Sequence, residues 1–284
     1  MAILKAAKKN VLTVVIELYG EMALEKTWQG PLYKRVLRRL LFPVYELMEL
    51  ISIKLSNAVF CVSWYSTEKY KKLHLNRNVF RVYNGANVAK ISRIKPKRFR
   101  KKTIFYMGGF PRWKGVDLLL RAFEIVKKKH PETQLVVMGG CDEEVKYDPE
   151  LGRLLSKKEG VVWIRYSPHE EAISNLKGAY IAVMPARDAF MTRVISSLKV
   201  FEHIAAEIPQ VCTDTGEHAE WVRKLDVGIV VKDTPEDIAK GILRLLEDKK
   251  LYKRLKENCR KRKWEVDNEI MKKPLIEYLK KLRK

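Results

Sequence analysis

The sequence predicts an α/β protein built on a doubly wound parallel sheet, because short apolar runs typical of buried strands alternate with amphipathic segments of helical period. Two further observations favour this fold class. Paired glycines follow two of the expected strands, at 108–109 and 139–140, and Pro185 follows a third. Thr234 and Pro235 also form a helix start, with an N-cap threonine before a proline at the first helical position.

The first third of the chain contains a helical segment, 31–56, in which Pro43 is expected to introduce a kink or to separate two shorter helices. A basic segment without periodicity, 91–102, is expected to be a linker between two domains. The strands expected before that linker are 11–18, 58–63 and 79–85, and a further helix is expected at 67–75.

The remainder of the chain alternates more regularly. The expected strands are 103–109, 134–140, 161–164, 180–185, 209–214 and 228–231, and the expected helices are 115–130, 169–179, 196–206, 217–225 and 234–248. Ligands of doubly wound sheets bind outside the carboxyl ends of the strands. The glycine pairs and Pro185 therefore mark the expected binding edge.

The net charge is +23, from 57 Lys and Arg against 34 Asp and Glu. Such an excess attracts nucleic acid, anionic lipid or phosphorylated substrates, although a solvated basic surface is the simpler alternative. No apolar run approaches the roughly 18 residues of a membrane span, and no apolar block of signal-peptide length opens the chain. The expected location is cytoplasmic, or peripheral on the cytoplasmic face of a membrane.

Metal sites and disulfides are not expected. Cys61, Cys141, Cys212 and Cys259 are far apart and show no CxxC spacing, which favours a reducing compartment. His169 and His218 have acidic neighbours, but no metal-binding spacing surrounds them. We therefore expect no metal and no other cofactor.

The stretch MGGFPRWKG, 107–115, combines glycines at a strand end, two cations and the start of a helix. Glycines allow close approach of the backbone to a ligand, and free N–H groups and cations attract anions, so the stretch could hold a diphosphate. The spacing is not that of a P-loop, and glycine pairs before helices are usually only structural.

Three stretches together resemble the GT-B glycosyltransferases of family 4. GG-x4-KGVDLLLRAFEIVKKKHPETQLVVMGG resembles the opening of that family's carboxy-terminal domain, KVFEHIAAEIPQVCTDTGEHAEWV its nucleotide-sugar signature, and VYNGANV its Asn-Gly turn before the linker. The resemblance implies a Rossmann-like, parallel-sheet carboxy-terminal domain that binds the donor, and a partial amino-terminal domain of similar type.

The resemblance also implies site residues. Glu202 matches the glutamate that accepts hydrogen bonds from the donor ribose hydroxyls, whereas the residues alone indicate only a solvated glutamate near a helix start. Lys114 matches the lysine that binds the donor diphosphate. No catalytic residue is assigned. The full set of donor-binding candidates is Glu202, Lys114, Lys199, Arg112, Gly108 and Gly109.

The sequence departs from the family pattern at three positions. Val194 stands where a second glutamate is usual, but Lys199 is typical of a branch of the family that lacks that glutamate. Gly109 stands where an arginine is usual, and Arg112 is the candidate substitute. Tyr19 stands where a histidine is common.

The resemblance also predicts the domain organisation. Members of the family carry about half a domain more at the amino terminus. The chain is therefore expected to be a fragment, a naturally truncated member, or one that takes the missing half from a second chain as its partner. The expected parts are 1–90, a partial acceptor-side domain; 91–102, a linker; 103–265, the donor-binding domain; and 266–284, a carboxy-terminal helix that packs back toward the amino-terminal domain.

The expected function is transfer of a sugar from a UDP, GDP or ADP sugar to an acceptor hydroxyl, with lipid-linked acceptors among the candidates. One alternative is a catalytically inactive nucleotide-sugar-binding subunit, or a fragment that needs a partner, because of the missing half of the amino-terminal domain, Val194 and Tyr19. Another is a nucleic-acid-binding protein, because of the charge. The sequence does not identify the base, the sugar, the acceptor or the stereochemistry.

Segment 31–56 has basic residues at 34, 35, 38 and 39, largely off an apolar stripe at 33, 36, 37, 40, 41 and 44. A basic amphipathic helix of this kind lies on anionic membranes. Packing of the stripe on the amino-terminal sheet is an equally expected outcome.

Overall fold

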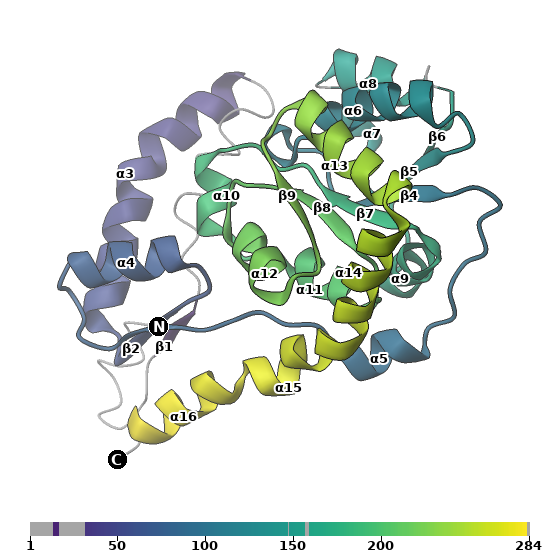
Figure 1. Cartoon of the computed structure of the whole chain (residues 1–284). Helices are drawn as coiled ribbons and strands as arrows, with labels where there is room; N and C mark the ends of the chain where they lie inside the picture. Colours follow the sequence, from purple (N-terminus) through teal and green to yellow (C-terminus); the bar gives the residue numbers. More distant parts are fainter. Residues whose placement is uncertain (1–13, 17–31, 147, 157–158, 283–284) are drawn as a thin grey trace. The chain divides into compact units, whose positions relative to one another are not determined.

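The computed structural model describes residues 14–16, 32–146, 148–156 and 159–282 (Figure 1). They form two compact units. The three-stranded unit comprises the described parts of Met1–Tyr83, Arg193–Ser196 and Met271–Lys284, and the six-stranded unit comprises those of Asn84–Thr192 and Ser197–Ile270.

The six-stranded unit contains a parallel sheet, which confirms the predicted α/β fold. Every neighbouring pair of strands is parallel, so all six carboxyl ends lie at one edge of the sheet. The strand order is β6 (Val161–Ile164), β5 (Gln134–Met138), β4 (Thr103–Met107), β7 (Ile181–Met184), β8 (Gln210–Thr213) and β9 (Gly228–Val231).

Helices cover both faces of this sheet (Figure 1). On one face, α6 (Val116–Lys129) and α13 (Pro235–Glu247) bury an apolar cluster with Val137, Val183 and Val211. Because side chains alternate along a strand, the strand residues next to these valines face the opposite side of the sheet. On that side α9 (His169–Gly178) contacts β4, and α12 (Glu217–Leu225) contacts β8 and β9.

The sequence explains where these helices form. In α6, Val116, Leu119, Leu120 and Phe123 are buried at helical spacing, while three lysines end the helix where its dipole favours cations. In α13, the Thr234 side chain accepts a hydrogen bond from the Asp237 N–H, and Pro235 occupies the first turn. The predicted N-cap is therefore confirmed.

Other elements differ from the expectation. The segment 91–102 is not irregular throughout, because α5 (Val88–Arg93) reaches into it. Asn87 starts this helix by accepting from the Lys90 N–H, and Val88 and Ile91 are buried along it. Four more helices that the sequence did not predict are α7 (Asp142–Lys146), α8 (Pro149–Ser156), α10 (Phe190–Val194) and α14 (Lys249–Arg262).

The remaining elements of this unit are short. They are α11 (Leu198–Ala205), the 3-10 turns η2 (Arg112–Lys114) and η3 (Lys263–Val266), and α15 (Asn268–Met271), which reaches the boundary of the unit. A parallel bridge joins Ala86 to Asp267 near the two ends of the unit.

The three-stranded unit has parallel strands in the order β1 (Val14–Ile16), β2 (Ala58–Cys61) and β3 (Val79–Arg81). Its helices are α3 (Leu32–Leu55), α4 (Trp64–Lys72) and α16 (Lys273–Leu282). The carboxy-terminal helix packs here: Leu275, Tyr278 and Leu279 lie against the cluster that contains Phe60, and the rings of Tyr278 and Phe80 stack at 4.1 Å. The rest of the strand expected at 11–18 lies outside the described residues.

Helix α3 runs through Pro43 without separating into two helices. Few of its described side chains are buried: Ile53 is, and so is Glu49, whose Oε1 accepts a hydrogen bond from Tyr70 Oη at 2.6 Å. The apolar stripe is open instead, with Leu40 70% and Tyr33 66% exposed, so it does not pack on the described sheet. No helix in the described part of the chain is long and apolar enough to cross a bilayer.

Two buried histidines contact the two ends of β8, His203 at its first residue and His218 at its last. His203 Nδ1 lies 3.1 Å from Gln210 Oε1, and His218 Nε2 donates to the Thr213 carbonyl at 3.0 Å. Burial lowers the pKa of each from 6.5 to about 4, because a charged imidazole loses its hydration there.

From the lowered pKa values of these two histidines we predict that the protein loses stability in mild acid. The unfolded chain binds their protons below pH 6.5, whereas the folded chain resists protonation down to about pH 4. The free energy of unfolding should therefore fall as the pH decreases through this window, by up to about 1.4 kcal/mol per pH unit for each histidine. Urea unfolding at several pH values measures the slope, and His218→Gln should reduce it by the contribution of that histidine, up to about 1.4 kcal/mol per pH unit. A slope that is unchanged in this variant would contradict the assignment to His218.

Candidate functional site

The predicted site residues lie at the carboxyl edge of the six-stranded sheet. Gly108 and Gly109 directly follow β4, and Arg112 and Lys114 form the η2 turn before α6. Lys199 and Glu202 belong to α11, which lies between β7 and β8 in the chain. Because the strands are parallel, the loops after β4 and β7, which are neighbours in the sheet, leave it at the same edge.

The turn that carries Arg112 and Lys114 is fixed by close contact with the segment after β7. Gly115 has a φ of +63°, and a Cβ atom there would lie 1.9 Å from the Pro185 carbonyl oxygen. Only glycine permits this approach. The Arg187 N–H also donates to the Trp113 carbonyl at 2.7 Å.

The guanidinium of Arg187 strengthens this attachment. It donates to the Arg112 carbonyl at 2.9 Å and to both carboxylate oxygens of Asp117, at 2.7 and 2.5 Å. Burial alone would raise the pKa of Asp117, but the hydrogen bonds and charge of Arg187 outweigh it and lower that pKa. The pair therefore stays ionised and holds the start of α6 against the neighbouring loop.

Lys199 lies against the glycine pair. A Cβ atom at Gly108 would be 3.0 Å from Lys199 Cε, and the backbone there has a φ of +148°. Tyr106 Oη donates to the Gly109 carbonyl at 2.7 Å and fixes the turn from the sheet side. The structure thus brings a cation from α11 to the glycine turn after β4.

A carboxylate connects the loops after β4 and β5. Glu144 accepts hydrogen bonds from the Phe110 N–H at 3.0 Å and from the Cys141 N–H at 3.2 Å. Its Oε1 would also lie 3.2 Å from a Cβ atom at Gly109. These contacts keep the two glycine-containing loops in a fixed arrangement.

Glu202 is largely buried, with 15% of its side chain exposed, and its Oε1 lies 2.7 Å from Nε2 of His169, the first residue of α9. The described hydrogen bonds do not include one to its Oε2. A ligand hydroxyl can therefore approach one oxygen while His169 orients the other.

The two cations of the η2 turn differ in environment. The Arg112 side chain is exposed, whereas Lys114 is half-buried with its Nζ 5.1 Å from the centre of the Trp113 ring.

Donor binding by Glu202, Lys114, Lys199, Arg112, Gly108 and Gly109 remains a prediction.

Sequence reasoning missed three residues that organise this edge: His169, Glu144 and Arg187. The sequence excludes His169 as a metal ligand and indicates no other role for it. The sequence places His169 at the start of a helix that follows a strand, which is where ligand-binding residues of such sheets occur. No nearby sequence pattern indicates a role for Glu144 or Arg187. In the described part of the chain, no group of three His, Cys, Asp or Glu side chains could hold a metal ion. Tyr19, a noted departure from the family, lies outside the described residues.

The arrangement suits a ligand that carries both an anion and neighbouring hydroxyl groups. The glycine turn and the cations can bind the anion, and a carboxylate can accept hydrogen bonds from two hydroxyls.

Two curated proteins are similar to part of the chain. Alpha-1,3/1,6-mannosyltransferase ALG2 of Rhizomucor pusillus is 26% identical over 168 residues, 50% of this chain and 37% of that protein. The uncharacterized glycosyltransferase MJ1069 of Methanocaldococcus jannaschii is 26% identical over 189 residues, 63% of this chain and 46% of that protein. The chain therefore matches less than half the length of either relative.

Solved structures share the fold at lower identity. Anabaena HepE in complex with UDP has a TM-score of 0.70 and 13% identity, over 99% of this chain and 80% of that one. WaaG, a glycosyltransferase involved in lipopolysaccharide biosynthesis, has a TM-score of 0.66 and 15% identity, over 94% of this chain and 74% of that one.

The family model described as glycosyl transferases group 1 matches residues 87–262. This range contains the six-stranded sheet with its glycine turn, Glu202 and Lys114. Because the match covers more than half of the chain, the protein belongs to the group 1 glycosyl transferases and has their GT-B type of fold.

Proposed function

We propose that this chain transfers a sugar from a nucleotide-sugar donor to an acceptor hydroxyl, with the donor bound at the carboxyl edge of the six-stranded sheet. The supporting observation is the pairing of two features at that edge. The glycine turn at 108–109 has Lys199 beside it, and Glu202 is held by His169 with its second oxygen available.

In this proposal, the protein acts mainly by positioning and by electrostatic stabilisation. Lys114, Lys199 and Arg112 neutralise the charge that develops on the leaving diphosphate, helped by backbone N–H groups of the glycine turn. Glu202 orients the donor by accepting hydrogen bonds from its ribose hydroxyls. No metal or other cofactor is part of the proposed mechanism.

The similar proteins support a nucleotide-sugar donor. The structures of Anabaena HepE contain UDP and UDP-glucose, and ALG2 is named as a mannosyltransferase. None of the proteins named above is described as binding nucleic acid. We keep UDP, GDP and ADP sugars as candidates, and a thermal-shift screen against all three distinguishes them.

Glu202→Gln and Lys114→Ala should each weaken binding of the nucleotide sugar found in that screen, because each removes a charge-assisted hydrogen bond to the donor. The loss is expected to be on the order of 1.5–3 kcal/mol, about tenfold or more in the dissociation constant measured by calorimetry. Glu171→Gln and Lys129→Ala are matched controls at exposed positions and should bind normally. Wild-type affinity in both site variants would show that the donor site lies elsewhere.

His169→Ala should weaken donor binding by about threefold to tenfold, since it removes the group that orients Glu202 Oε1. His169→Gln can still donate a hydrogen bond and should recover most of the affinity. Melting temperatures should change little, because 56% of the His169 side chain is exposed. Equal affinity in all three proteins would exclude a positioning role for His169.

We also propose that the protein associates with anionic membrane surfaces through α3. The supporting observation is the row of exposed apolar side chains along this helix, together with the basic residues at 34, 35, 38 and 39. Each cation near an anionic surface contributes about 1 kcal/mol, and the apolar side chains can enter the headgroup region. A lipid or lipid-linked acceptor would fit this location.

Liposome flotation tests the membrane proposal. The chain should float with vesicles of mixed phosphatidylserine and phosphatidylcholine but not with phosphatidylcholine alone, and Arg35→Glu/Arg38→Glu/Arg39→Glu should reduce recovery several-fold. The control Lys250→Glu/Lys253→Glu/Lys256→Glu makes the same charge change on α14 and should float normally. Equal recovery of the two triple variants would mean that net charge alone drives association. Absence of binding at physiological salt would overturn the proposal.

A further inference from the structure

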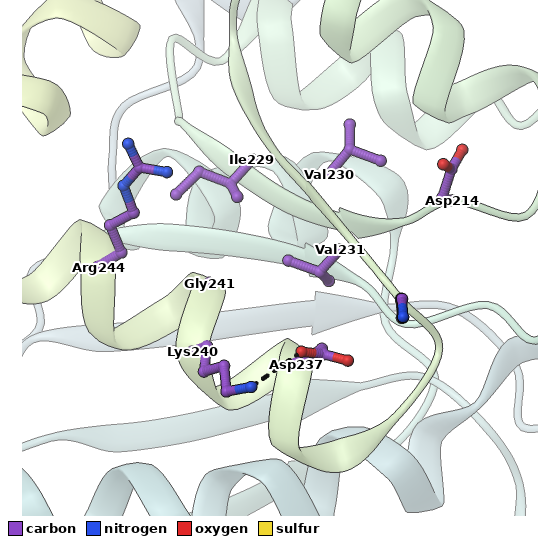
Figure 2. A pocket seen from close by; sticks show the side chains of 9 residues that line it. Asp214, Ile229, Val230, Val231, Asp237, Lys240, Gly241 and Arg244 are labelled. Atoms are coloured by element: carbon purple, nitrogen blue, oxygen red, sulfur yellow. Dashed lines mark hydrogen bonds and ion pairs between the residues drawn. The ribbon is translucent and has the colours of Figure 1, made fainter.

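Strand β9 forms one edge of the six-stranded sheet, and a groove follows its open side. Two adjoining hollows of about 400 and 310 Å³ share Ile229, Val230 and Arg244 as lining residues. Figure 2 shows Arg244 and Lys240 of α13 beside Ile229 and Val231 of the strand. The groove therefore runs along β9 between side chains of the flanking helices, all within one unit.

The backbone of β9 has hydrogen-bonding groups that face this groove. The carbonyls of Val227 and Val231 accept from Gln210 and Asp214, so these alternate residues face β8. Because N–H and C=O groups alternate in direction along a strand, those of Gly228 and Val230 point to the opposite side. No described strand pairs with β9 on that side. An extended chain could hydrogen-bond there as a seventh strand.

The charged side chains along the groove determine which kind of added strand would bind there. Val211, Ile229 and Val231 face the α13 side of the sheet, so an added strand would direct alternate side chains toward α13 and toward the opposite face. Cations occur on both sides. The groove is lined by five cations and two carboxylates, so its net charge is +3. These residues are Arg223, Lys232, Lys240, Arg244 and Arg254, with Asp214 and Asp237.

Some of these charges are already neutralised. Arg223 pairs with Asp214, Lys240 pairs with Asp237 at 3.3 Å, and Arg254 lies 3.6 Å from Asp226. The exposed side chains of Arg244 and Lys232 make no ion pair with a described residue. They remain available for the carboxylates of another chain.

We propose that the β9 groove binds an extended acidic segment of a partner protein by adding it as a strand to the sheet. Backbone hydrogen bonds to Gly228 and Val230 give the affinity, and Arg244 and Lys232 give the preference for acidic side chains. A second copy of this chain is disfavoured as the occupant, because its own basic edge would repel the groove.

The probe is the octapeptide acetyl-Glu-Glu-Val-Val-Glu-Glu-Val-Val-amide, which can present carboxylates on both faces of a strand. Fluorescence anisotropy of a labelled form gives its affinity for the full chain at physiological salt. We compare it with the same peptide N-methylated at every residue, which cannot donate backbone hydrogen bonds, and with a peptide that has Lys in place of Glu. Only the unmodified acidic peptide should bind.

Two variants test the two parts of the proposal. Arg244→Glu removes the charge preference, and Val230→Pro removes an N–H that faces the groove without disturbing the pairing with β8. Each should weaken peptide binding at least tenfold. Arg153→Glu makes the same charge change as Arg244→Glu on α8 and should bind normally. Each variant's melting temperature shows whether it is folded.

Amide hydrogen exchange locates the bound peptide. The peptide should slow exchange at Gly228, Val230 and Lys232 more than at Ile229 and Val231, which already face β8. The proposal is overturned if the N-methylated peptide binds equally well, if Arg153→Glu and Arg244→Glu weaken binding equally, or if the acidic peptide does not bind at about 1 mM.

Discussion

The interaction of Arg187 with Asp117 holds together the candidate donor site. One guanidinium satisfies both oxygens of a carboxylate and the carbonyl of Arg112, a residue of the turn that carries Lys114. Both side chains are only 25% exposed, so loss of one partner would leave a charge with limited access to water, which costs several kcal/mol when burial is complete. The close approach allowed by Gly115 completes this attachment, and the cations of the turn depend on it for their position.

The sequence predicted the sheet well because buried parallel strands are apolar runs with clear ends. The bounds predicted for β6 and β9, Val161–Ile164 and Gly228–Val231, are those of the structure. Helix α14 could not be predicted in this way. Its 14 residues bury only Tyr252, Leu255 and Cys259, so charged residues hide its period. Helix α5 was missed because only two of its six residues, Val88 and Ile91, are buried, which is too few to show a helical period.

The sequence predicted those parts of the candidate site whose residues lie close together in the chain. A glycine pair followed by cations and a helix start is a pattern within one short segment, and a known family gave Lys114 and Glu202 their expected roles. The contacts that organise these residues join distant positions. His169 meets Glu202 across 33 positions, Glu144 meets Phe110 across 34, and Arg187 meets Asp117 across 70. Such pairs are set by strand order, which no local pattern contains.

The strand order also determines how the six-stranded unit can assemble. The central strand β4 pairs with β5, which follows soon after it, and with β7, which follows only after β6. Helix α6 packs against α13, which is made after all six strands. Closing such distant contacts costs chain entropy before it brings any packing energy. A nascent chain that ends before Pro235 would therefore expose the part of the apolar surface of α6 that α13 covers. Exposed apolar surface of this kind makes a folding intermediate prone to aggregation and a target for chaperones.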